Sequence, residues 1–199
     1  MSAAKHIATI SVEDYLAGEE VARHKHEYAA GRIYMMAGAR NAHNVLASAV
    51  LGSFHVQLRG RKCQPFNSDT KVRIVLASGT RFYYPDVMVV CSPNPPGDVY
   101  QDRPVVIVEV LSPATKRVDE GEKREAYMSI PTLTHYLMVD THRPRVVVSS
   151  RTPTGAFADH VYDGMDAVIP LESISATLAL AEVYERAEFR DDSTEEEDQ

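Results

Sequence analysis

Apolar residues recur along the chain with two different periods, and the change of period marks out the expected elements. Over residues 42–58 they return every three or four positions, which predicts an amphipathic helix. A second helix is predicted over residues 119–129, where Pro131 ends it. A shorter helix is expected to begin after Ser11, because an acid at Asp14 is typical of a helix N-terminus.

Segments with strand patterns lie between and after these helices. A hairpin-like turn at Gly31 is expected within residues 27–37, EYAAGRIYMMA. Further strands are predicted at Asp69–Leu76, Tyr83–Val90, Val105–Leu111, His135–Asp140, Arg145–Ser149 and Ala156–Tyr162. A last amphipathic segment runs through Leu178 and Tyr184. This succession predicts a mixed α/β fold with a central sheet, flanking helices and at least one crossover helix.

One acid interrupts the most apolar of these strands. The run VIVEVL, residues 106–111, has the pattern of a strand buried on both faces, and Glu109 lies within it. A carboxylate that is buried without a partner costs several kcal/mol. We therefore expect Glu109 to be neutralised, paired with a cation or bound to a metal ion.

The preceding strand carries a second acid of the same kind. Asp86 stands in YYPDVMVV just before an apolar run, so its carboxylate can converge with that of Glu109 if the two strands are neighbours. Two adjacent carboxylates repel each other unless a divalent cation holds them or one is protonated. Their oxygen atoms suit Mg²⁺ or Mn²⁺ better than zinc.

A lysine on the next helix can complete this pair. Spacing by four places Lys123 on one helical face with Asp119 and Tyr127, and a lysine on a partly buried face can reach back toward Glu109. Two carboxylates and a lysine are the parts needed for metal-assisted hydrolysis of a phosphodiester, because the metal activates water and the cations balance the transition-state charge. Lys123 could equally pair with Asp119 on a solvated face.

The composition is that of an ordinary globular protein. The chain has 199 residues, of which 44% are hydrophobic and 25% charged. We expect one domain over residues 1–190 and a disordered acidic tail over residues 191–199. The chain has no run of about 18 apolar residues and no signal-peptide pattern, so a cytoplasmic protein without membrane contact is expected. Cys63 and Cys91 lack a paired spacing and are expected to be buried thiols in a reducing compartment.

Charge is distributed unevenly along the chain. The net charge of −7 comes mostly from the tail, which holds six acids and no basic residue. Basic residues cluster at Arg59, Arg61, Lys62, Lys71 and Arg73, and again at Lys116, Arg117, Lys123 and Arg124. Such clusters either contact phosphates or form only a solvated face.

Five segments, in this order and spacing, resemble the Uma-two family of restriction endonucleases. They are KHEYAAGRIYMMAGARNAH, SDTKVRI, FYYPDVMVVC, VIVEVLSPATKRVDEGEKREAY and HYLMVD. The resemblance covers roughly residues 11–185, which is nearly everything except the acidic tail. It implies membership of the PD-(D/E)XK nuclease superfamily and a restriction-endonuclease-like fold, in which helices flank a mixed sheet.

The resemblance also implies roles for individual residues. Asp86 and Glu109 match the metal-binding acids. The superfamily's usual lysine, two positions after the glutamate, is replaced by Leu111 here, and Lys123 of GEKREAY matches the lysine that this family carries on the following helix. Glu27 of HEYAAG matches an N-terminal acid that binds metal through water. The alternatives are a turn aspartate at Asp86, a structural pair of Glu109 with Lys123, and a helix-end salt bridge at Glu27.

Four further positions enter the hypothesis with less weight. The backbone carbonyl of Val110 is expected to complete the metal site. Asp69 of SDTKVRI is a weaker candidate and more often would be structural. His43 is expected to cap or pack at the start of the long helix. His135 departs from the family pattern, in which an acid more often stands there.

Two functions of different classes follow. The first is a Mg²⁺-dependent (or Mn²⁺-dependent) endonuclease that cuts nucleic acid, with DNA favoured, and works as a homodimer because two sites suit two strands. The second is a nuclease-fold module that binds nucleic acid or regulates without hydrolysis. The two acids and the lysine favour the enzyme, whereas the nearly neutral body and acidic tail favour the module.

Overall fold

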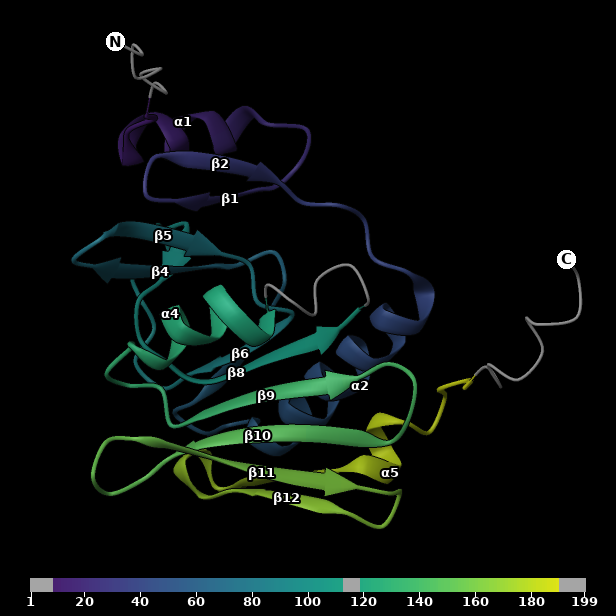
Figure 1. Ribbon diagram of the computed structural model, residues 1–199. Helices are drawn as coiled ribbons and strands as arrows, with labels where there is room; N and C mark the ends of the chain where they lie inside the picture. The colour runs from purple at the N-terminus through teal and green to yellow at the C-terminus, as the bar shows by residue number, and fades with distance from the viewer. Residues whose placement is uncertain (1–8, 113–118, 190–199) are drawn as a thin grey trace, which may run out of the picture.

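The computed structural model describes residues 9–112 and 119–189 of the chain, and its strands form three sheets in these ranges (Figure 1). The largest is six-stranded, in the order β11-β10-β9-β8-β6-β3. Its strands are β3 (Gln64–Asn67), β6 (Val87–Val90), β8 (Pro104–Leu111), β9 (His135–Asp140), β10 (Arg145–Arg151) and β11 (Phe157–Asp163). All neighbours pair antiparallel except β8 and β9, which are parallel. The chain is thus mixed α/β, as the sequence predicts.

A second, five-stranded sheet lies above the first in Figure 1, in the order β2-β1-β5-β4-β7. It is built from β1 (His26–Ala29), β2 (Arg32–Met35), β4 (Lys71–Leu76), β5 (Gly79–Tyr83) and β7 (Tyr100–Gln101). A two-stranded ribbon consists of β12 (Val168–Leu171) and β13 (Ala176–Ala179). The sequence predicts one central sheet, so the division into two larger sheets is a finding of the structure.

Helices cover both faces of the six-stranded sheet. These are α2 (Asn41–Leu58), a π-helical turn η1 (Asp119–Lys123) that continues into α4 (Arg124–Met128), a 3₁₀ turn η2 (Glu172–Ile174) and α5 (Leu180–Val183). The remaining helix α1 (Val12–Val21) packs instead on the five-stranded sheet, where Tyr15 contacts Tyr28 and Phe82. Side chains of α2 and α5 share one hydrophobic cluster with the sheet, and those of α4 belong to another. The η1–α4 segment lies between the parallel strands β8 and β9, which confirms the predicted crossover helix.

The two clusters sort the residues of β8 by their alternation along the strand. Val106, Val108 and Val110 belong to the cluster beneath α2, whereas Ile107 and Leu111 belong to the cluster beneath α4. Both faces of the strand are therefore buried, as predicted. Since Glu109 is two positions from Ile107, it points to the α4 side.

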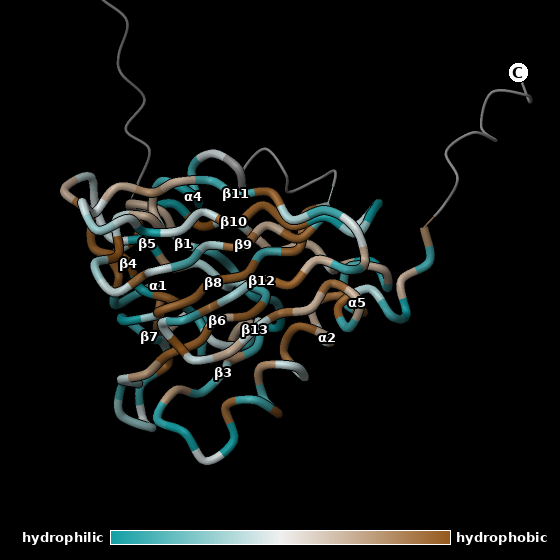
Figure 2. The backbone as a smooth tube through the Cα atoms, turned by 90° about the horizontal axis from the view of Figure 1, so that it is seen from below, coloured by the Kyte–Doolittle hydropathy of each residue, from teal (hydrophilic) through white to brown (hydrophobic). Residues whose placement is uncertain are grey.

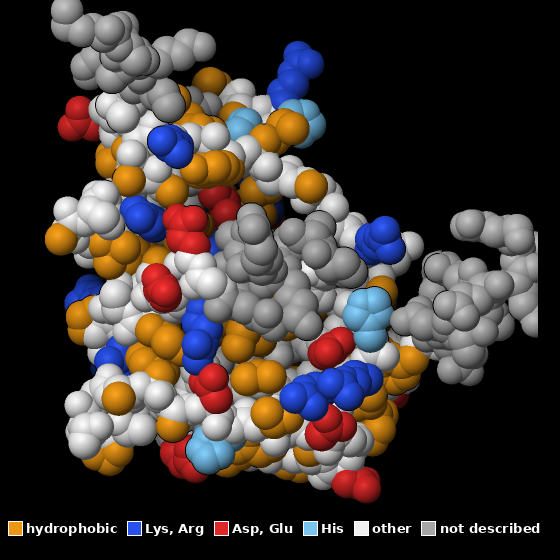
Figure 3. Space-filling view, in the orientation of Figure 1, with side chains coloured by type: hydrophobic (Ala, Val, Ile, Leu, Met, Phe, Trp, Pro, Cys, Tyr) orange, Lys and Arg blue, Asp and Glu red, His pale blue; other side chains and the backbone are white. Residues whose placement is uncertain are grey.

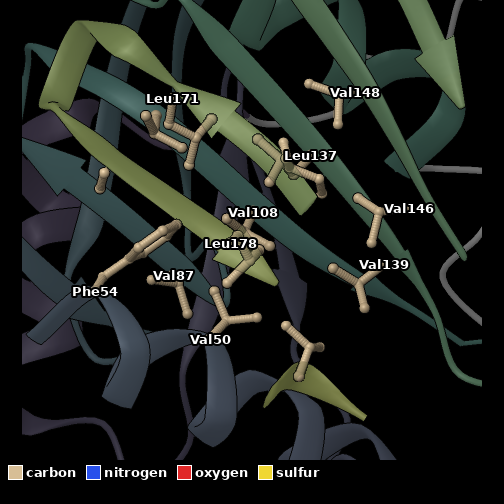
Figure 4. Close-up of a cluster of buried hydrophobic side chains, with 14 of the residues drawn as sticks. Val50, Phe54, Val87, Val108, Leu137, Val139, Val146, Val148, Leu171 and Leu178 are labelled. Atoms are coloured by element: carbon tan, nitrogen blue, oxygen red, sulfur yellow. The ribbon is translucent and has the colours of Figure 1, made fainter. Parts of the chain in front are cut away.

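The larger cluster fills the space between α2 and the sheet. In Figure 4, Val50 and Phe54 of α2 lie close to Val87 of β6 and Val108 of β8. Figure 2 shows hydrophobic stretches along the central strands β6, β8 and β9, and more hydrophilic chain in the outer loops. This cluster fixes the position of α2 and therefore of the residues in its first turn.

Local signals near the N-terminus are confirmed. Ser11 caps α1, because its Oγ accepts a hydrogen bond of 3.0 Å from the backbone N–H of Asp14. Strands β1 and β2 form the predicted hairpin, and Gly31 adopts a φ of +92° in its turn. A Cβ at this glycine would lie 2.8 Å from the Cβ of Thr9, so both conformation and space require glycine.

The predicted strand Tyr83–Val90 is wrong as a single element. Strand β5 ends at Tyr83 in the five-stranded sheet, and β6 begins at Val87 in the six-stranded sheet. The break falls at Pro85, which has no N–H to donate to a strand ladder. Asp86 consequently lies where the chain passes from one sheet to the other.

A disulfide joins Cys63 and Cys91, so the expectation of two buried thiols is wrong. The two cysteines are 28 residues apart, so no local spacing in the sequence indicates that they pair. Cys63 precedes β3 and Cys91 follows β6, and these strands pair antiparallel with Gln64 opposite Val90, which brings the two cysteines together. Disulfides persist in oxidising compartments, so the cysteines no longer support a reducing one.

The end of α4 is held by one arginine. Arg151 donates hydrogen bonds of 3.1, 2.7 and 2.7 Å to the carbonyls of Met128, Ile130 and Leu133. We expect Arg151→Met to lower the free energy of unfolding by about 2 kcal/mol, because several carbonyls lose a charged donor. Urea unfolding followed by circular dichroism would measure this. The matched control is Arg143→Met, at a side chain 58% exposed, and equal losses in both variants would contradict the prediction.

Candidate functional site

The candidate site lies at the junction of the two larger sheets. Val87 of β6 pairs with Val108 of β8, which sets Asp86, one residue before, beside Glu109, one residue after. The backbone N–H of Asp86 donates a hydrogen bond of 3.4 Å to Oε2 of Glu109. The two acids are therefore neighbours on adjacent segments, and the Glu109 carboxylate lies beside the backbone of Asp86.

Asp86 is held by contacts to its Oδ2 atom. The backbone N–H of Val110 donates a hydrogen bond of 2.7 Å to this oxygen. The Nε2 atom of His43 lies 3.1 Å from the same oxygen. One contact comes from β8 and the other from the first turn of α2, so two separate elements fix the orientation of the carboxylate.

Glu109 is only 3% exposed and has partners from the η1–α4 segment. The phenol of Tyr127 donates a hydrogen bond of 2.8 Å to its Oε1 atom, and Nζ of Lys123 lies 3.7 Å from the same oxygen. These partners offset the cost of burying the charge. Spacing by four along the helix brings both side chains to one acid, whereas the sequence analysis predicts this approach for Lys123 alone.

Lys123 makes a shorter contact with a different acid. Its Nζ lies 2.8 Å from Oε1 of Glu27 on β1, and 5.6 Å from the centre of the Tyr83 ring. The lysine is 7% exposed. Glu27 also accepts a hydrogen bond of 3.3 Å from the backbone N–H of Tyr84. Glu27 therefore joins the site through Lys123, and this pair links the five-stranded sheet to the η1–α4 segment.

The phenol of Tyr127 remains a hydrogen-bond donor at any ordinary pH. Complete burial raises the pKa of Tyr127 well above its usual value of 10, and the negative charges of Glu109 and Glu27 raise it further. The group therefore keeps the proton that it shares with Glu109. A fixed donor of this kind orients the carboxylate without changing its own charge.

The residues fit a hard divalent cation that keeps part of its water shell. Mg²⁺ is typically bound by one or two carboxylates together with waters and substrate phosphates. Asp86 and Glu109 supply two such carboxylates at one place. Within residues 9–112 and 119–189, no group of three or more histidine, cysteine, aspartate or glutamate side chains could hold a metal ion.

Two weaker candidates lie elsewhere. Asp69 has a side chain 70% exposed and pairs with Lys25, which lowers the pKa of its carboxyl. His135 is the first residue of β9 and pairs with Val106 of β8, which is three residues before Glu109. Burial lowers the pKa of His135. Among the contacts of residues 9–112 and 119–189, neither residue forms a hydrogen bond or an ion pair with Asp86 or Glu109. Of the predicted helical face, the side chain of Asp119 lies outside the described residues, as do Lys116, Arg117 and the tail.

The sequence arguments missed two residues at this place. His43 was expected only to cap or pack, and Tyr127 was named only as a member of the helical face of Lys123. Tyr127 is fully buried, yet it also donates to Glu109. Its spacing from Lys123 was a usable signal. His43 is 43 positions from Asp86, and no local pattern indicates that they meet.

Tyr127→Phe removes one hydrogen bond from a buried acid. We expect it to lower the free energy of unfolding by about 1–2 kcal/mol, because Glu109 loses a donor while the ring still fills its space. Chemical denaturation would measure the change. Tyr162→Phe, on the partly buried strand β11, is the control and should change stability by less than about 0.5 kcal/mol. A larger loss in the control would contradict the reasoning.

Comparisons with known proteins converge on one family. Residues 12–181 match the Uma2 family model, described as "Putative restriction endonuclease". The "Uncharacterized protein slr1290" of Synechocystis is 33% identical over 181 residues, which cover 90% of this chain and 94% of that protein. The "Uncharacterized protein sll1609" of the same organism is 33% identical over 140 residues, covering 69% and 78%.

A solved structure has the same fold. It is described as "a putative nuclease belonging to DUF820" from Anabaena variabilis, and it superposes with a TM-score of 0.67 at 15% identity. The match covers 88% of this chain and 98% of the other. The restriction-endonuclease-like fold expected from the sequence is thereby supported. Among the described residues, none of the helices has the length and apolar character needed to cross a membrane.

Proposed function

Because this chain belongs to the Uma2 family, we propose that it is a metal-dependent endonuclease that hydrolyses phosphodiester bonds of nucleic acid, with DNA as the favoured substrate. One observation carries the proposal. Asp86 and Glu109 converge from two neighbouring strand segments, beside the ammonium of Lys123. The ammonium of Lys123 lies beside the carboxylates of Glu27 and Glu109, and Asp86 adds a third acid next to Glu109, so this gathering of acids supports a divalent cation at the site.

Asp86, Glu109 and the backbone carbonyl of Val110 are the proposed ligands of Mg²⁺ or Mn²⁺. A cation held there would supply an activated water and neutralise charge on the phosphate. Two contacts preorganise the ligands. The N–H of Val110 fixes the Asp86 carboxylate, and the phenol of Tyr127 fixes that of Glu109.

Lys123 is the proposed source of positive charge beside the reacting phosphate. Its ammonium can donate a hydrogen bond to the attacking water or to a phosphate oxygen, and so stabilise charge that develops in the transition state. Glu27 holds the ammonium at 2.8 Å and thereby restricts where it can point. In this account Glu27 is a positioning residue that acts through Lys123.

The distribution of charge on the surface favours weak rather than strong binding of nucleic acid. On the face drawn in Figure 3, basic and acidic side chains are interspersed, without a single large basic field. Association with nucleic acid should therefore be weak and sensitive to salt. Cutting both strands of a duplex then favours a homodimer, in which two sites act on one molecule of DNA.

The direct test is cleavage by the full chain in the presence of metal. Supercoiled plasmid, linear duplex DNA and single-stranded RNA are incubated with Mg²⁺, Mn²⁺ or a chelator. We expect nicking or linearisation of DNA with either metal and none with the chelator. Cleavage that persists with the chelator would contradict a metal-dependent mechanism.

The second candidate function is binding without hydrolysis. It is favoured by the small number of convergent metal-binding side chains among the described residues. Filter binding over a series of salt concentrations separates the two functions. Salt-sensitive retention of DNA, without cleavage in any divalent metal, would support the binding module and exclude the nuclease.

A further inference from the structure

We propose that the outer face of α2 is the interface through which two copies of this chain form a symmetric dimer. The face consists of Val45, Ser48, Gly52 and Val56, which recur at three- and four-residue spacings on the helix. All four residues are exposed, and the exposed fraction of Val56 is 67%. The opposite side of α2 is buried against the sheet. This proposal concerns assembly and stands whether or not the chain cleaves nucleic acid.

The first argument is the lack of charge on α2. Its 18 residues, NAHNVLASAVLGSFHVQL, include no aspartate, glutamate, lysine or arginine, although 25% of the whole chain is charged. A surface helix normally carries charged residues on its outer face. The ten-residue helix α1 does so, with exposed acids at Glu13, Asp14 and Glu20. Depletion of charge is the compositional mark of the central part of a protein interface.

The second argument is the shape of this surface. A hollow of about 940 Å³ lies on the α5 side of α2, and another of about 530 Å³ lies on the β3 side. Both are lined by Ser48, Gly52 and Val56, so the α2 face is a low ridge between two hollows. Small residues at the centre allow a second helix to approach closely.

The third argument is that the pattern is complementary to itself. If two α2 helices pack antiparallel about a two-fold axis at the middle of the face, Ser48 lies against Gly52 of the partner subunit. Val45 then lies against Val56 of the partner subunit, and the reverse contacts follow by symmetry. The larger side chains at the two ends can enter the hollows beside the opposing helix. A charged partner such as nucleic acid would instead leave its phosphates facing a helix that has no lysine or arginine.

Gly52→Arg tests this interface without disturbing the subunit. A Cβ at Gly52 would meet no atom within 4 Å, so the substitution adds bulk and charge only to the outer face. Gly18→Arg is the matched control, because Gly18 is also an exposed helical glycine with open space around it. We expect wild type and Gly18→Arg to sediment as dimers at about 50 µM, and Gly52→Arg to raise the dimer dissociation constant about 100-fold or more.

A charge pair tests the antiparallel register. Val45→Glu and Val56→Lys should each weaken the dimer, and the double variant should recover most of the loss, because each glutamate then faces a lysine of the other subunit. Thermal melts check that all variants fold. The proposal is overturned if wild type is a monomer at this concentration, if Gly52→Arg remains a dimer, or if the double variant dimerises no better than the weaker single one. Loss of DNA binding in Gly52→Arg, with the dimer unchanged, would assign the face to nucleic acid instead.

Discussion

Asp86→Asn should slow the cleavage of nucleic acid by about a thousandfold, because it replaces one of two carboxylates that would share the cation. The fold should survive. The asparagine keeps an oxygen that can accept the hydrogen bond now made by the N–H of Val110, and the side chain is 15% exposed. The affinity for Mn²⁺ should fall together with the rate, because a neutral amide oxygen is a weaker ligand for a hard cation.

The measurement is the initial rate of plasmid nicking at saturating Mg²⁺, together with Mn²⁺ binding by calorimetry. Asp69→Asn is the matched control. The same change of aspartate to asparagine is made there in the SDTKVRI motif, away from the candidate site. The side chain of Asp69 is exposed and pairs with Lys25. Its rate should stay within about twofold of wild type. If Asp69→Asn abolished cleavage and Asp86→Asn did not, the candidate site would be in the wrong place.

The core of the candidate site could be predicted because its signals are local. An acid inside an apolar strand must have a partner when both faces are buried, and this reasoning alone singled out Glu109. Asp86 followed from the same reasoning applied to the preceding strand. Lys123 followed from helical spacing, which is a property of the backbone and does not depend on tertiary structure.

The parts that were missed depend on how distant segments pack. The contact of His43 with Asp86 joins the first turn of α2 to the passage between the two sheets. The pairing of Glu27 with Lys123 joins strand β1 to the η1–α4 segment, and the disulfide joins the ends of β3 and β6. Strand register and order set these contacts, and neither is encoded in the spacing of residues along the chain.

The strand predicted at Tyr83–Val90 shows a related difficulty. Its apolar pattern is continuous, and Pro85 is the only local sign of a break. A proline is compatible with an edge strand, a bulge or a change of sheet, so it does not choose among them. The change of sheet matters for the site, because it frees Asp86 from a strand ladder and leaves its carboxylate available beside Glu109.

Lys123→Met should lower kcat by about 500-fold, because the site loses the only ammonium near Glu109 among the described contacts. Methionine retains the length of the buried side chain. The substitution should also destabilise the metal-free protein by about 3 kcal/mol, because Glu27 and Glu109 lose the charge that pairs with them. Saturating Mn²⁺ should restore part of this stability, since the cation would supply positive charge to Glu109. Thermal melts with and without metal would measure the difference.

The role of Glu27 is tested by combining Glu27→Gln with Lys123→Met in one double variant. Glu27→Gln alone should lower kcat about tenfold while the KM for DNA changes little, because Lys123 loses its nearest partner but stays in the site. If Glu27 acts only through Lys123, the double variant should be no slower than Lys123→Met, and the two effects should not add. Additive losses, which would multiply to about 5,000-fold, would mean that Glu27 acts independently, as an outer-sphere metal ligand would. The non-additivity is decisive because a purely structural role for Glu27 would lower the stability of both backgrounds without coupling the two residues in kcat.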